Sequence, residues 1–201
     1  MKESTTIKFL YLVLGAVLGF ALFGALRFTL YKPDTTHYHA NFAVYVNGVR
    51  NEFKDPSFYE EVSACNKDEI GPKHRAHLHN NTSDVVHVHD HAVTWGAFFA
   101  NLGYSMSDKY LQARTKLYLA DDTNTVHFVL NGKEISDVSN TVIGDQDRLL
   151  VNFGNDNAVG RQKQFESVAN TAAAVDKAKD PAACSGAEAI TTQDRLQHLF
   201  Q

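Results

Sequence analysis

The chain has 201 residues, of which 44% are hydrophobic, and this composition supports one sizeable core and excludes global disorder. The formal net charge is -4 and no long basic run is present, so nucleic acid is excluded as the expected partner, because phosphate binding needs clustered Lys and Arg. Histidine is the residue in excess. The ten histidines are about twice the ordinary usage, and most of them fall between His37 and His91.

The N-terminal segment carries a strong membrane signal. Residues 9–26 contain no charged side chain, and the apolar stretch continues past Arg27 to Tyr31. At about 1.5 Å per residue this segment can span a hydrocarbon core of roughly 30 Å, with the Arg27 side chain reaching to the interface. We therefore expect a cytoplasmic tail at residues 1–8 and a transmembrane anchor at residues 9–31, with the lipid bilayer as its partner.

A cleavable signal peptide is the competing interpretation, although the apolar run is longer than the usual region of about 7 to 15 residues. A short basic tail before one apolar segment resembles a signal-anchor, which implies a single-pass protein of the cell membrane with its C-terminal domain outside the cytoplasm. In that oxidising setting Cys65 and Cys184 either pair or remain two core thiols. Gly15 and Gly19 form a GxxxG motif, from which we expect a homodimer.

The segment after a linker at residues 32–36 reads as a mixed domain. The alternation of residues 39–53 predicts a β-hairpin that turns at Asn47-Gly48, and the same pattern recurs at residues 127–135. A final strand is expected at residues 148–153. One short amphipathic helix is predicted between the hairpins, from Thr94 as N-cap, through Trp95, Phe98, Phe99 and Leu102 at helical spacing, to Gly103.

The predicted fold class is therefore α+β, with a small mixed or antiparallel sheet and one packed amphipathic helix. Its arrangement resembles a β-grasp domain. We expect the His-rich domain to cover residues 37–154 and a helical C-terminal extension to cover residues 155–201, with helices at residues 161–179 and 191–200.

The histidines occur as three His-x-His units. On a strand, residues two apart share a face at about 7 Å, which lets two imidazoles bind one ion with bonds of about 2.0 to 2.1 Å. The run from His87 to His91 would span about 13 Å on a straight strand, so either the strand bends at Asp90 or there are two sites. We expect at least two chelating pairs. The predicted metal ligands are His37, His39, His77, His79, His87, His89 and His91.

The ligand type narrows the choice of ion. Imidazole suits Zn and Cu(II), while the presence of only Met1 and Met106 argues against a methionine-rich Cu(I) carrier. We therefore expect a Zn or Cu ion as the cofactor. A pH sensor is another function open to clustered imidazoles, because their ordinary pKa lies near 6.5.

Two motifs resemble those of metalloenzyme families. The spacing of Gly71, His77, His79 and Asp84 is similar to the first cupin motif, with Asp84 in place of the usual Glu. The segment from His87 to His91 resembles the HxHxDH motif of metallo-β-lactamase-type hydrolases, but it is one residue shorter. The apolar anchor together with the HLH and HVH units resembles a group of uncharacterised, His-rich, membrane-anchored prokaryotic proteins.

The first functional hypothesis is a non-catalytic, extracytoplasmic protein that captures, buffers or delivers metal. It is favoured because no nucleophile elbow, phosphate loop or isolated carboxylate pair stands out. Two alternatives remain open. One is a metal-dependent hydrolase or oxygenase in which three histidines hold the ion and Asp84 or Asp90 is the general base. The other is a module whose structural zinc ties the first hairpin to residues 77–91.

Overall fold

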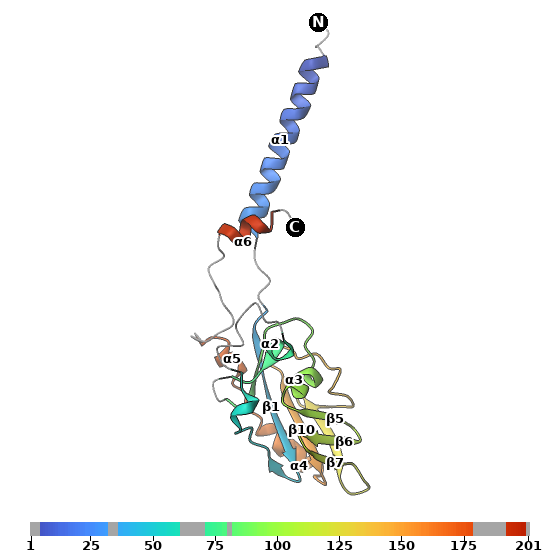
Figure 1. Cartoon of the computed structure of the whole chain (residues 1–201). Coiled ribbons are helices and arrows are strands. Elements are labelled where there is room, and N and C mark those ends of the chain that lie inside the picture. Colours follow the sequence, from blue (N-terminus) through green and yellow to red (C-terminus); the bar gives the residue numbers. More distant parts are fainter. Residues whose placement is uncertain (1–4, 32–35, 61–70, 80–81, 179–191, 200–201) are drawn as a thin grey trace. The chain divides into compact units, whose positions relative to one another are not determined.

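In the computed structural model the chain divides into two compact units. Figure 1 shows the chain with many of its helices and strands labelled. One unit is Met1–Asp34 with Gly186–Gln201, and the other is Thr35–Ser185. Cys65 and Cys184, whose pairing the sequence left open, lie outside the described residues. The structure describes residues 5–31, 36–60, 71–79, 82–178 and 192–199.

The first unit is built on one long apolar helix, α1 (Thr5–Leu30). Its segment Ile7–Leu30 has 24 residues and is long and apolar enough to cross a membrane. At 1.5 Å per residue that segment measures about 36 Å, which exceeds the thickness of a typical hydrocarbon core. The helix begins four residues before the predicted anchor because its backbone hydrogen bonding continues past the apolar run.

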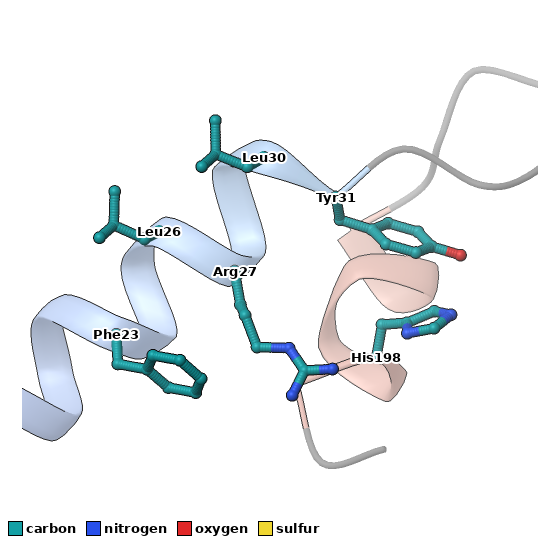
Figure 2. Close-up of a pocket in the computed structure, with 6 residues that line it drawn as sticks. All are labelled: Phe23, Leu26, Arg27, Leu30, Tyr31 and His198. Carbon is teal, nitrogen blue, oxygen red and sulfur yellow. The ribbon is translucent and has the colours of Figure 1, made fainter.

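A short helix, α6 (Thr192–Gln197), belongs to the same unit. The Arg195 guanidinium donates to the carbonyl oxygens of Phe28 and Thr29 at 2.5 and 3.3 Å, and so satisfies carbonyls at the end of α1 that have no partner within the helix. The same unit has a pocket of about 380 Å³, and Figure 2 shows the side chains that line it. It offers one imidazole and no carboxylate, so it is a poor metal site. Its lining consists of Phe23, Leu26, Arg27, Leu30, Tyr31 and His198.

The second unit contains a mixed β-sheet in the strand order β3-β4-β1-β10-β8-β9, with β2 paired to β1. The β1 and β10 strands run parallel, and the other neighbours pair antiparallel. The unit is therefore α+β, as the sequence predicted. The strands are β1 (Tyr38–Val46), β2 (Val49–Arg50), β3 (Ala76–His77), β4 (Val85–Val88), β8 (Thr125–Leu130), β9 (Lys133–Ile135) and β10 (Arg148–Gly154).

Both Asn-Gly turns are confirmed. Asn47 and Gly48 have φ values of 51° and 77°, and Asn131 and Gly132 have φ values of 50° and 79°. Positive φ at both central residues is the requirement of a type I′ turn, which Asn and Gly meet at little steric cost. These turns join β1 to β2 and β8 to β9, and thereby set the register of both hairpins.

One face of the sheet carries the main hydrophobic core. The helix α3 (Trp95–Asn101) packs here and is capped by Thr94, whose hydroxyl accepts from the Ala97 amide at 3.1 Å. A three-stranded sheet that the sequence analysis did not predict contributes buried side chains to the same core. Its strands are β5 (Tyr104–Ser107), β6 (Tyr110–Ala113) and β7 (Lys116–Leu119), and the short helices α2 (Pro72–Arg75) and η1 (Pro56–Phe58) lie in the connections.

The other face is covered by the segment after β10. The sequence predicted one helix over residues 161–179, but the structure divides this region into α4 (Ala158–Glu166) and α5 (Ala172–Val175). The division arises because Asn41 of β1 accepts hydrogen bonds, both 2.9 Å long, from the backbone amides of the two residues that open α5. A polar side chain of the sheet therefore starts a new helix here.

Candidate metal centre

Each His-x-His unit has one member on a strand: His77 on β3, His87 on β4 and His39 on β1, and these three strands are neighbours in the sheet. The other members, His79, His89 and His37, lie within two residues of the ends of those strands. Alternation along β4 turns Val86 and Val88 into the main core and His87 to the opposite face. In the strand register, His87 lies directly opposite His39 on one side and His77 on the other. The central strand thus brings histidines from all three units onto one sheet face.

Six imidazoles form a contiguous cluster on this face, which we call the imidazole cluster. The shortest contact joins two units: the ring centroids of His39 and His87 are 4.3 Å apart, and those of His37 and His89, also from different units, are 4.7 Å apart. Within the His-x-His units the centroids are 4.6 to 6.5 Å apart. The sequence predicted separate chelating pairs, whereas the structure joins them. The members are His37, His39, His77, His79, His87 and His89.

Burial keeps the central imidazoles uncharged. The exposed fraction of His87 is 4% and that of His77 is 3%. Burial, with repulsion from neighbouring imidazoles in second place, lowers the pKa of His87 to about 2 and that of His89 to about 3. Burial also lowers the pKa of His77 to about 4. These rings are therefore neutral near pH 7, which is the protonation state in which imidazole binds a metal.

Three members of the imidazole cluster offer the closest set of ligand atoms. One nitrogen from each of His37, His87 and His89 lies within 4.8 Å of the others. Two nitrogens bound to one tetrahedral ion are about 3.4 Å apart, so small side-chain rotations would complete the site. The Nε2 atom of His89 is buried without a hydrogen-bond partner among the described residues, which fits a nitrogen that a metal would engage.

Two further members are oriented by backbone carbonyls. The Nδ1 atom of His77 lies 3.0 Å from the Lys73 carbonyl oxygen, and Nδ1 of His79 lies 2.9 Å from the Glu60 carbonyl oxygen. A carbonyl only accepts, so in both rings Nδ1 carries the hydrogen and the lone pair resides on Nε2. Metal-binding histidines are typically oriented in this way.

The structure places His91, also predicted as a ligand, away from the other predicted ligands. The strand β4 ends at Val88, and the chain then turns through Ala92, whose φ is 54°. The His91 side chain is exposed, and its Nε2 atom lies 2.8 Å from the Thr36 hydroxyl. A strand bent at Asp90 therefore does not bring this ring into the imidazole cluster.

The histidines outside the cluster have local roles. His74 accepts the Gly71 amide hydrogen at 2.8 Å, at the start of α2. His127 lies on β8 and hydrogen-bonds Glu134. His198 packs against Tyr31 in the other unit, with ring centroids 4.2 Å apart.

The two carboxylates considered as general bases are both in ion pairs. Asp84 lies 3.4 Å from the Arg50 guanidinium, and Asp90 lies 2.7 Å from that of Arg75. The hydrogen bond from Arg75, together with that from the His91 amide, lowers the pKa of Asp90.

Sequence reasoning missed Asp176, which follows α5 and whose Oδ1 lies 2.5 Å from Nδ1 of His39. No motif marks it, because it is 137 positions from His39 in an alanine-rich segment. No protein-family model, curated protein or solved structure matches the chain. Functional inference therefore rests on the imidazole cluster itself.

Proposed function

We propose that the protein binds Zn or Cu(II) through the imidazole cluster, and that it captures, buffers or delivers the ion. One observation carries this proposal: six imidazoles, from three adjacent strands and the residues next to their ends, form one cluster with neighbouring centroids 4.3 to 6.5 Å apart. Burial of several neutral imidazoles together has no benefit for an apolar core, because each ring carries polar nitrogens that need partners.

A carrier or buffer is favoured over an enzyme by two features. A tetrahedral ion takes four ligands, whereas the imidazole cluster has six rings. The two additional imidazoles would allow the ion to move from one set of ligands to another. In addition, the carboxylates of Asp84 and Asp90, considered as general bases, are each paired with an arginine. The three-nitrogen set of His37, His87 and His89 favours the second candidate, a metal-dependent hydrolase or oxygenase with an open fourth position.

Anchorage of the domain to a membrane is the second part of the proposal. We propose that α1 spans the cell membrane once and that the imidazole cluster lies outside the cytoplasm. The length and apolar character of Ile7–Leu30 support the span. Alkaline carbonate extraction should leave the chain in the membrane pellet, and protease added to intact spheroplasts should digest the cluster-bearing unit. Release of the chain by carbonate would contradict the membrane span. Protection of the cluster-bearing unit from protease would contradict its position outside the cytoplasm.

The fold of the second unit supports a β-grasp assignment. The strand that opens the domain, β1, lies beside the strand that closes it, β10, and the two are parallel. In the sheet, β4 lies beside β1 and β8 lies beside β10. Along the chain, the helix α3 lies between these two outer strands, β4 and β8. An experimental structure in which β1 and β10 are not neighbours would contradict the assignment.

The metal proposal is tested on the full chain, purified in detergent without a polyhistidine tag. After incubation with micromolar Zn or Cu(II) and gel filtration, elemental analysis should find at least about one ion per chain. The His91→Ala variant is the matched control and should retain the same content, because this ring lies outside the cluster. Less than about 0.2 ion per chain in the unmodified protein would refute the proposal.

A further inference from the structure

We propose that Asp176 is a positioning residue of the metal centre, acting on His87 through His39. This inference rests on the proposed metal-binding function and adds a hydrogen-bonded chain that selects which nitrogen His87 offers to the ion. The chain runs from the Asp176 carboxylate to Nδ1 of His39 at 2.5 Å, and from Nε2 of His39 to Nδ1 of His87 at 2.9 Å.

The direction of each hydrogen bond follows from the acceptor at its end. An ionised carboxylate can only accept, so Nδ1 of His39 carries a hydrogen. In the neutral ring, Nε2 of His39 is then an acceptor, and Nδ1 of His87 must donate to it. The lone pair of His87 consequently resides on Nε2, which becomes its ligand atom. His39 is 1% exposed, so bulk water does not compete for these bonds.

The sheet itself holds Asp176 in place. Asn41 lies two residues after His39 on the same face of β1, and its Oδ1 atom accepts both amides that open α5. Its Nδ2 atom donates to the Thr171 hydroxyl at 3.0 Å. The strand β1 therefore carries both His39, which contacts the Asp176 carboxylate, and Asn41, which anchors the helix α5 just before Asp176. The Asp176 side chain is 25% exposed.

This arrangement changes the role of His39. The sequence predicted His39 as a metal ligand, but both of its ring nitrogens are hydrogen-bonded in the chain. Its contribution is to orient the His87 ring and to fix its tautomer, as hydrogen-bond partners do for metal-bound histidines. Removing such a partner typically lowers metal affinity by about 10 to 100-fold.

The test compares Zn affinities of full-length variants in detergent, by competition with a chromophoric chelator. Asp176→Ala should bind Zn about 10 to 100-fold more weakly than the unmodified chain. Asp176→Asn retains an acceptor oxygen without the charge and should lose less. Lys177→Ala, at the next and exposed position, should bind like the unmodified chain.

The second readout is the tautomer of His87, measured by ¹⁵N NMR on the metal-free, ¹⁵N-histidine-labelled chain. We expect the Nδ1–H form in the unmodified protein and a mixture of tautomers in Asp176→Ala, which a purely structural role would not produce. Unchanged affinity together with an unchanged tautomer in a folded variant would overturn the inference while leaving metal binding intact. If the unmodified chain bound no Zn, the proposed function would fail, and the tautomer would still report on the hydrogen-bonded chain.

Discussion

Replacing His87 with alanine is expected to weaken Zn binding by at least about 100-fold. Removing a residue that only orients a ligand weakens metal binding by up to about 100-fold, and removing a ligand itself should cost at least as much. His87 is central because it lies opposite both His39 and His77 in the strand register. It also belongs to the closest three-nitrogen set with His37 and His89. No other single histidine of the imidazole cluster has all of these relations, so its loss should have the largest effect.

The matched measurements separate loss of a ligand from loss of the fold. His87→Gln keeps a polar side chain of similar length and should also lose Zn affinity, while its circular dichroism spectrum stays that of the unmodified chain. His127→Ala, on β8 and outside the cluster, should bind Zn within about twofold of the unmodified chain. If folded His87→Gln bound Zn within threefold of the unmodified chain, the cluster would not be the site.

The metal-free domain should lose stability as the pH falls below about 6.5. In the folded state the pKa values of His77, His89 and His87 are lowered to about 4, 3 and 2, from an ordinary value of 6.5. The unfolded chain therefore binds protons between pH 6.5 and about 4 that the folded chain does not, and the free energy of unfolding falls with pH over this window. At pH 5 the loss is about 1 to 2 kcal/mol for each ring.

Urea unfolding at pH 7, 6 and 5 in the presence of a chelator measures this dependence. The expected loss between pH 7 and pH 5 is several kcal/mol, to which carboxylates elsewhere add little above pH 5. His87→Gln has no proton to gain at this position, so its stability should fall less steeply over the same window. Parallel pH profiles for the variant and the unmodified chain would show that burial does not suppress protonation of His87.

Local structure was predictable because its causes are local. The alternation of residues 39–53 predicted the first hairpin, and in β1 it places Phe42 and Val44 in the main core and leaves His39 out of that core, on the other face. The Asn-Gly pairs set two turns through their tolerance of positive φ. Helical spacing from Trp95 to Leu102 identified α3, because its apolar side chains share one face.

The composition of the site depends on pairing between distant segments. Which His-x-His units meet is set by β4 lying between β3 and β1, and nothing in the spacing of the units specifies that order. Asp176 reaches His39 only because Asn41 interrupts the predicted C-terminal helix. The position of His91 outside the imidazole cluster likewise follows from the turn after β4 and not from its place in the motif.

X-ray absorption spectroscopy at the zinc edge of the Zn-loaded, full-length chain tests the central claim most directly. Imidazole ligands give nitrogen scattering at about 2.0 to 2.1 Å together with the multiple-scattering pattern of the ring. We predict at least three imidazole nitrogens per ion, with the signal lost in His87→Gln. A shell dominated by sulfur at about 2.3 Å, or by oxygen without imidazole scattering, would contradict metal binding by the imidazole cluster.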